Sequence, residues 1–292
     1  MGVIEEIANV AGVVNLSPQA GAAKSNYDPL AAFAARRPED IHYTADINSL
    51  ATAAWIWARN PDVLLQCGWS QILKRDVLSI PAKLSIGVHP SPLPVGRGAA
   101  VLNWRIIEGG GPWGNSLFVM EDKTDKGDIL DFEPFVIEPR DDIRTANEKV
   151  NETTITMLRR TIPRIADGSI VRTPQDNSRV TRYYKRTPED GRVSADWSAE
   201  KICRYVRALT KPFPGAFLNV AGEKLLIWKA EAGALCHRDN GTILEVDPNR
   251  GARIAVGGGE SIWLTRVTST VELVVGDSLT GRSVAAAAKI GV

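Results

Sequence analysis

The chain has 292 residues, about twice the length that one hydrophobic core usually organises, so two domains are expected. Hydrophobic residues make up 44% and charged residues 24%, a globular balance that excludes a disordered or fibrous protein. Lys and Arg total 35 against 34 for Asp and Glu, so no overall field is available to hold a polyanion. Nucleic acid is therefore not the expected partner.

The sequence also favours a cytoplasmic location. The longest apolar runs, such as residues 284–288, fall far short of the roughly 20 residues that cross a bilayer. The amino terminus carries Glu5 and Glu6 where a signal peptide would carry Lys or Arg. Three widely separated cysteines are typical of a reducing compartment. We therefore expect a cytoplasmic protein without a membrane span.

Helical and extended patterns alternate along the first part of the chain, which predicts an open α/β sheet with parallel strands and crossover helices. Such sheets normally open with a buried strand, whereas this chain starts on a helix, so the first strand of the sheet is expected to be missing. A misassigned or truncated start and a sheet that really lacks this strand both stay open as explanations. The predicted helices lie at 3–10, 29–37, 49–59, 99–107 and 142–165. The predicted strands lie at 13–16, 40–44, 63–65, 84–88 and 116–120.

A polar, Arg-rich stretch over 167–193 interrupts this pattern, so we expect a catalytic domain at 1–170, a linker at 171–194 and a second domain at 195–292. The second domain opens on a predicted helix at 199–209. Short strands separated by Gly, Asn and Asp turns follow it and predict a small, OB-like β-barrel. These strands lie at 216–220, 224–230, 241–246, 252–256 and 261–267.

His89 is the histidine with a functional position, because it ends the predicted strand at 84–88 and precedes a rigid proline-rich loop. In open α/β sheets, ligands bind beyond the carboxyl ends of the strands. A catalytic and a structural role both stay open for it. His42 and His237 lie in polar surroundings and are expected at the surface.

Three aspartates follow the predicted strand at 116–120. Asp122, Asp125 and Asp128 surround Gly127 and partly match a calcium loop, but no bidentate Glu follows at the required distance. We therefore expect no metal site.

Several separated motifs resemble the folate-dependent formyltransferases, in the order in which that family carries them. The motifs are His-Pro-Ser-Pro-Leu-Pro at 89–94, Arg-Gly at 97–98, Asn-Trp at 103–104 and Asp-Lys-Gly-Asp-Ile-Leu at 125–130. Residues 196–198, 206–209, 214–217 and 241–246 are similar to the family's carboxyl-terminal barrel domain. The resemblance covers the chain from about residue 3 to about residue 267.

The resemblance implies transfer of a formyl group from N10-formyltetrahydrofolate to an amine without a covalent enzyme intermediate. Such a reaction develops a tetrahedral oxyanion and must protonate the departing folate nitrogen. His89 would be the imidazole at the reacting carbonyl, and Asp125 would keep it oriented. The implied folate-binding residues are Gly68, Trp69, Ser70, Asp122 and Asp128. The implied acceptor-binding residues are Ser91, Pro92, Arg97, Gly98, Asn103 and Trp104. Trp69 could equally be a packing residue, and for Trp104 core packing is the favoured interpretation.

One position departs from the family pattern, which has an Asn two residues before the histidine, where this chain has Gly87. Loss of one oxyanion donor typically lowers kcat by about 10² to 10³. A water or backbone N–H could replace it, one of Ser85, Ser91 and Asn115 could reach in, or the enzyme could be impaired. Compensation is the interpretation that we favour.

The acceptor is expected to be a nucleotide-linked amino sugar. The family's transfer-RNA enzymes carry a basic insertion where residues 17–25 of this chain hold a single lysine. Residues 97–104 and 186–190 are more similar to the nucleotide-sugar enzymes, notably the one that acts on 4-amino-4-deoxy-arabinose. The alternatives are methionyl-tRNA formylation and a formyltransferase-like protein that binds without efficient turnover. A homodimer also stays open.

Overall fold

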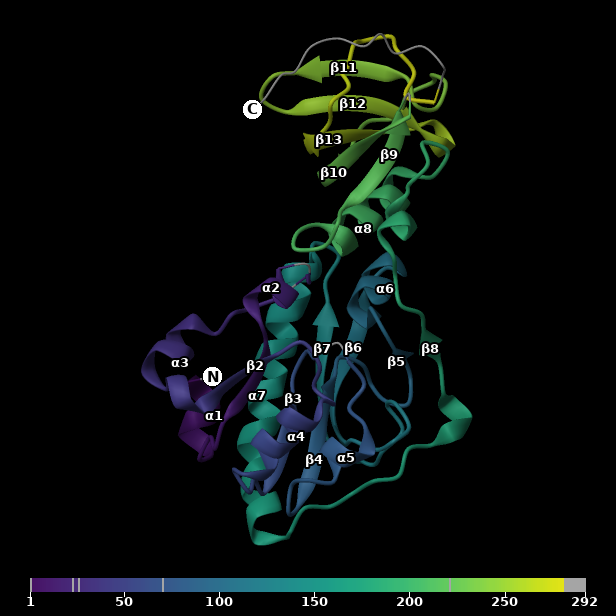
Figure 1. Cartoon of the computed structure of the whole chain (residues 1–292). Helices are drawn as coiled ribbons and strands as arrows, with labels where there is room; N and C mark the ends of the chain where they lie inside the picture. The colour runs from purple at the N-terminus through teal and green to yellow at the C-terminus, as the bar shows by residue number, and fades with distance from the viewer. Residues whose placement is uncertain (1, 23, 26, 70, 221, 281–292) are drawn as a thin grey trace. The chain divides into compact units, whose positions relative to one another are not determined.

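The structure is a computed structural model that describes residues 2–280 apart from residues 23, 26, 70 and 221 (Figure 1). Its contacts form two compact units. Unit 1 comprises Met1–Val101, Pro112–Val136 and Asn147–Tyr184. Unit 2 comprises Leu102–Gly111, Ile137–Ala146 and Lys185–Val292. Each unit is therefore built from segments that lie far apart in the sequence.

The main sheet of unit 1 has the strand order β3-β4-β6-β7. The strands are β3 (Val63–Gln66), β4 (Leu84–His89), β6 (Gly111–Val119) and β7 (Ile129–Ile137). β3 pairs with β4 in parallel, whereas β6 pairs with β4 antiparallel and places Ser116 opposite His89. The sheet is therefore mixed rather than wholly parallel, and the strand that bears His89 lies inside it.

A separate two-stranded sheet joins β1 (Val13–Leu16) to β2 (Ile41–Thr44) in parallel. Among the described residues, β1 pairs with β2 alone and β3 pairs with β4 alone, so no strand joins the two sheets. The two sheets are therefore separate within the described residues. The helices of this part are α1 (Gly2–Ile7), α2 (Pro18–Gly21), α3 (Ala31–Arg36) and the 3₁₀ turn η1 (Pro38–Asp40). α1 is shorter than the predicted helix at 3–10.

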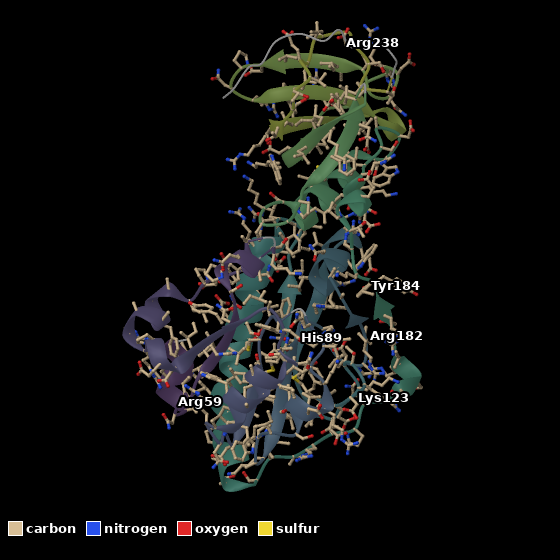
Figure 2. All side chains as sticks on the ribbon, in the orientation of Figure 1. Arg59, His89, Lys123, Arg182, Tyr184 and Arg238 are labelled. Atoms are coloured by element: carbon tan, nitrogen blue, oxygen red, sulfur yellow. The ribbon has the colours of Figure 1, made fainter. Side chains whose placement is uncertain are left out.

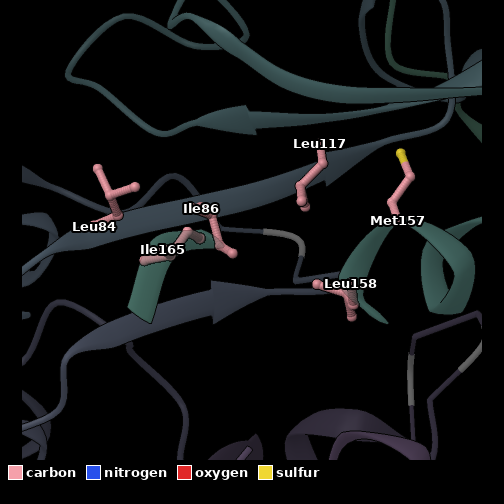
Figure 3. Close-up of a cluster of buried hydrophobic side chains, with 6 residues drawn as sticks. All are labelled: Leu84, Ile86, Leu117, Met157, Leu158 and Ile165. Carbon is pink, nitrogen blue, oxygen red and sulfur yellow. The ribbon is translucent and has the colours of Figure 1, made fainter. Parts of the chain in front are cut away.

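Helices cover both faces of the main sheet. The 25-residue helix α7 (Ile143–Asp167) packs Met157, Leu158 and Ile165 against Leu84, Ile86 and Leu117 of β4 and β6 (Figure 3). The other face packs against α4 (Leu50–Trp57), which Ser49 caps, and α5 (Arg75–Leu78). Strand alternation explains the two layers, because successive residues of a strand point to opposite faces.

Residues 171–184, part of the stretch predicted as a linker, are here named the return segment. They belong to unit 1, where β8 (Arg182–Tyr183) pairs in parallel with β5 (Arg97–Gly98). Thr173 also exchanges two backbone hydrogen bonds with Ile129, at 2.8 and 2.9 Å. The 3₁₀ turn η2 (Asn177–Arg179) lies between these contacts. The segment is polar because its partners are backbone and amide groups, and a hydrophobic pattern does not report such pairing.

Unit 2 contains a sheet of five strands in the order β11-β12-β13-β10-β9, with antiparallel neighbours. The strands are β9 (Ala216–Val220), β10 (Glu223–Ala232), β11 (Ile243–Asp247), β12 (Gly251–Val256) and β13 (Glu260–Thr268). The unit also holds most of α6 (Val101–Ile107), the helix α8 (Ala199–Leu209) and the 3₁₀ turns η3 (Pro188–Gly191) and η4 (Gly257–Gly259). The predicted small β domain is therefore present.

Within the described part of the chain, each helix is too short or too polar to cross a membrane.

Candidate active site

His89 is the last residue of β4 and is only 7% exposed. Figure 2 shows it among the central strands of unit 1, with Arg182 and Lys123 nearer the edge of that unit. Its Nε2 lies 2.8 Å from the carbonyl oxygen of Gly96, which can only accept a hydrogen bond, so Nε2 carries a hydrogen. Nδ1 is therefore the nitrogen that can take up or release a proton.

The proline-rich loop after His89 is held by hydrogen bonds from β6. Trp113 donates its indole N–H to the carbonyl of Pro90 at 2.7 Å. Ser116 donates its hydroxyl to the carbonyl of Ser91 at 2.7 Å and accepts the N–H of Leu93 at 3.1 Å. The loop therefore has a fixed path, and it delivers the Gly96 carbonyl to the imidazole.

Asp125 lies on the loop between β6 and β7 and faces His89. Its Oδ2 accepts the backbone N–H of Gly98 at 2.8 Å, and its Oδ1 lies 3.8 Å from Nδ1 of His89. That distance is too long for a direct hydrogen bond but suits an ion pair when the imidazole is protonated. Both side chains are nearly buried, with exposed fractions of 8% and 11%. The pair can hold a proton and stabilise the cation that results.

The loop of Asp125 has an uncommon backbone. Asp125 has a φ of 57°, in the left-handed region, which Asp and Asn enter more readily than other non-glycine residues but still at a cost in free energy. A Cβ on Gly127 would lie 1.8 Å from the carbonyl oxygen of Val119, so only glycine fits there. Tertiary contacts must therefore hold this turn.

Arg97 and Gly98, predicted to bind the acceptor, form β5 inside unit 1. Arg97 is 1% exposed, and its guanidinium donates to Gln175 and Asn177. Burial lowers the pKa of Arg97, Arg182 adds to this effect and Asp125 opposes it. Gly98 has a φ of 108°, and a Cβ there would lie 2.1 Å from the carbonyl oxygen of Tyr183. The structure thus gives both residues a supporting place beside Asp125.

Gly87 lies two residues before His89 on β4, and its surroundings leave little space for a side chain. A Cβ there would lie 3.0 Å from Cγ of Met120 and 3.0 Å from Cε1 of Phe118. The Phe118 ring contacts His89 edge-on, with 6.5 Å between the ring centroids. Hydrophobic neighbours therefore occupy the place of a side chain at position 87.

The three polar residues proposed to replace the missing amide differ in their partners. Ser85 donates its hydroxyl to the carbonyl of Leu78 at 2.8 Å. Asn115 donates its amide to α7, at 2.9 Å to the Thr154 hydroxyl. The Ser91 hydroxyl is buried and has no hydrogen-bond partner among the described residues. Of the three, Ser91 alone has a side-chain donor without a hydrogen-bond acceptor among the described residues.

Asn103 and Trp104, also predicted to bind the acceptor, lie in unit 2. Asn103 is 3% exposed and donates its amide to the carbonyl of Ala208 at 2.7 Å. The guanidinium of Arg186 lies 4.4 Å from the Trp104 ring, and burial lowers the pKa of Arg186. These contacts make Asn103 part of the packing around α8 and give Trp104 a cationic partner.

The predicted folate residues are dispersed over two loops of unit 1. Gly68 is exposed with a φ of 71°, and Trp69 packs beside the cluster of Ile47 and Val77. Asp122 is exposed, and Asp128 is half-buried and accepts the N–H of Val119 through its carbonyl. Ser70 lies outside the described residues. Pro92, which was predicted to bind the acceptor and not the folate, accepts the N–H of Val95 at 3.0 Å through its carbonyl.

Gln175 is a site residue that sequence reasoning missed. It lies in the return segment, is 8% exposed and donates to the carbonyl oxygens of Asp125 and Gly127. No motif or periodicity marks a glutamine within a polar stretch, so the sequence carried no signal for it.

A cavity of about 480 Å³ lies elsewhere in unit 1, at the amino-terminal end of β4 and therefore at the opposite end from His89. Lys83, one of its lining residues, donates to the carbonyl of Ala166 at 2.7 Å and so caps the end of α7. The described residues contain no group of three or more His, Cys, Asp or Glu side chains arranged to hold a metal ion.

Comparison with known proteins identifies the family that the sequence motifs resemble. Residues 4–162 match the family model for formyl transferase, and residues 185–272 match formyl transferase, C-terminal domain. Over 208 residues the chain is 33% identical to the bifunctional polymyxin resistance protein ArnA of Wigglesworthia glossinidia brevipalpis. That alignment covers 71% of this chain and 32% of ArnA, so the chain spans about a third of the length of this relative.

Two solved structures share the fold over most of the chain. WlaRD, a sugar 3N-formyl transferase studied with dTDP and 5-N-formyl-THF, is 17% identical with a TM-score of 0.60, and 93% of each chain is covered. The methionyl-tRNA formyltransferase from Clostridium thermocellum is 20% identical with a TM-score of 0.56, covering 84% of this chain and 98% of its own. The match to the first family model alone spans more than half of the sequence, and the chain therefore belongs to the formyl transferase family.

Proposed function

We propose that this protein transfers a formyl group from N10-formyltetrahydrofolate to the amino group of a nucleotide-linked sugar. The observation that carries the proposal is the buried pair of His89 and Asp125, with Nδ1 and Oδ1 3.8 Å apart, in a member of the formyl transferase family. The pair lies at the carboxyl end of β4, where an open α/β sheet binds its ligands.

The geometry supports a proton-transfer role for His89. Because Nε2 is held on the Gly96 carbonyl, Nδ1 accepts the proton that the attacking amine loses and returns it to the folate nitrogen as that nitrogen leaves. Asp125 stabilises the imidazolium in between, and the N–H of Gly98 holds its other oxygen. No proton is gained or lost overall, and neither side chain changes covalently.

Support for the sugar acceptor comes from the sequence and from the fold relatives. Residues 17–25 hold one lysine, which provides little positive charge for binding the phosphates of transfer RNA. WlaRD, which aligns over 93% of its own chain with 93% of this chain, is a sugar formyl transferase. The formylated amino sugar would serve as a building block for a surface polysaccharide. The three free cysteines are consistent with synthesis in a reducing cytoplasm.

The test offers 10-formyltetrahydrofolate with a panel of amino-sugar nucleotides and, separately, with methionyl-tRNA. Release of tetrahydrofolate and the mass of the acceptor are followed together. We expect formylation of at least one sugar nucleotide, and the His89→Ala variant is the matched inactive control. Product with methionyl-tRNA alone would overturn the proposal that the acceptor is a nucleotide-linked amino sugar. Folate binding without any product would overturn the activity and favour a binding protein.

A further inference from the structure

We infer that Gln175 is a positioning residue that holds Asp125 in place for the reaction. The inference rests on the proposed function and adds a residue that neither family model covers, because position 175 lies between the matched ranges 4–162 and 185–272. Gln175 acts on the loop of Asp125 from the return segment, and it contacts neither imidazole nitrogen in the described structure.

All four hydrogen-bonding positions of the Gln175 amide are used. Its Nε2 donates to the carbonyl oxygen of Asp125 at 3.0 Å and to that of Gly127 at 2.7 Å. Its Oε1 accepts from Nε of Arg97 at 3.1 Å and from Nη2 at 2.6 Å. A nearly buried amide with every position filled is fixed in one orientation.

The chemistry of the partners dictates that orientation. Arg97 can only donate, so the amide oxygen must face it, and carbonyl oxygens can only accept, so the amide nitrogen must face the loop. Arg97 is itself buried, so its hydrogen bonds to Oε1 hold the Gln175 amide in this orientation. A rotated amide would set N–H against N–H and oxygen against oxygen.

The loop needs such a clamp. Asp125 occupies the left-handed region with a φ of 57°, and Gly127, two residues further on, leaves no room for a Cβ beside the carbonyl of Val119. Gln175 bonds the main chain on both sides of this turn, while the Gly98 N–H bonds the carboxylate. Release of the Gln175 bonds would let the turn relax, and the carboxylate would then leave both Gly98 and His89.

Three adjacent amides give a readout that does not depend on activity. The N–H of Gly98 bonds the Asp125 carboxylate, whereas those of Arg97 and Ala99 bond the carbonyls of Thr181 and Tyr183 in the return segment. Movement of Asp125 should expose Gly98 alone. Detachment of the return segment should expose Arg97 and Ala99 as well.

The first experiment measures hydrogen exchange of these amides in the full chain carrying Gln175→Met, which keeps the side-chain length but removes every hydrogen bond. Gly98 should exchange at least about tenfold faster, and Arg97 and Ala99 should stay within about threefold. Gln175→Glu serves if the first variant fails to fold, because its carboxylate keeps an acceptor for Arg97 but has no N–H for the loop. Asn177→Ala is the control, since Asn177 bonds Arg97 and not the loop.

The second experiment compares steady-state rates. Gln175→Met should lower kcat at least about tenfold and change KM for the folate less than about threefold. In an Asp125→Asn background it should add less than about twofold, because the two residues act as a unit.

Equal acceleration of all three amides, unchanged exchange at Gly98, or full additivity with Asp125→Asn would overturn the inference. If the wild-type protein formylates no acceptor, the proposed function fails. The exchange experiment still decides the role of Gln175 in that case.

Discussion

The backbone N–H of Gly98 holds Oδ2 of Asp125 at 2.8 Å, which leaves Oδ1 turned toward His89. A short strand that pairs with the return segment therefore orients the carboxylate of the site. Because a main-chain donor cannot be lost by side-chain rotation, this orientation is more durable than one set by a surface side chain.

His89 should be required for transfer, because it provides the nitrogen that can take the proton from the amine. His89→Ala should lower kcat by at least about 10². His42→Gln and His237→Gln are the matched controls and should leave kcat near that of the wild type. Near-normal turnover of the His89 variant would exclude the proposed mechanism.

Asp125 should act through its charge. Asn tolerates the left-handed backbone and can still accept the Gly98 N–H, so Asp125→Asn should fold normally and bind folate while kcat falls by at least about tenfold. Combined with His89→Ala, it should lower kcat little further. Incubation with EDTA should change nothing, and metal-dependent recovery of activity would contradict this assignment.

Gly87→Asn should not restore the family's usual amide donor. The new Cβ would press on Phe118 and Met120, and Phe118 contacts His89. We expect a loss of stability of about 1 to 3 kcal/mol and a lower kcat. Gly87→Ala is the control that separates the Cβ from the amide. A higher kcat for the Asn variant, measured beside its Tm, would show that the missing donor limits the native enzyme.

Ser91 should contribute more to turnover than Ser85. The Ser91 hydroxyl is uncommitted within the described residues, whereas Ser85 bonds the carbonyl of Leu78. If Ser91 has taken over oxyanion stabilisation, Ser91→Ala should lower kcat by about tenfold or more with little change in Tm. Ser85→Ala should lower Tm and spare kcat. The reverse pattern would assign Ser91 to packing.

His42 should make stability depend on pH below neutrality. His42 is half-buried, although its polar sequence neighbours predicted a surface position. This burial, with a smaller contribution from Arg59, lowers the pKa of His42 below its usual value of about 6.5. The unfolded chain therefore binds a proton before the folded chain does, and the free energy of unfolding should fall as the pH drops through that value. Urea titrations at pH 7.5 and 5.5 should show a smaller difference for His42→Gln than for wild type or for His237→Gln. An unchanged difference would mean that His42 titrates alike in both states.

Local sequence patterns predict the order of most helices and strands. Ser49 marked a helix start and the apolar run at 84–88 marked a buried strand, because capping and periodicity act between neighbours in the chain. The position of His89 at a strand end followed from the same local pattern. β7 was not predicted, since Pro134 and alternating acidic residues argue against an interior strand, but an edge strand tolerates them.

The assembled site was decided by tertiary structure. Asp125 could be named by resemblance, but its approach to His89 depends on a strained turn that Gly98 and Gln175 hold, from 27 and 50 residues away along the chain. Such contacts join polar residues that recur at no regular spacing along the sequence, so the sequence pattern predicted a linker around Gln175. Hydrophobic patterning fixes which residues are buried, whereas hydrogen-bond partners are chosen only when the sheet and the return segment bring donors and acceptors within about 3 Å.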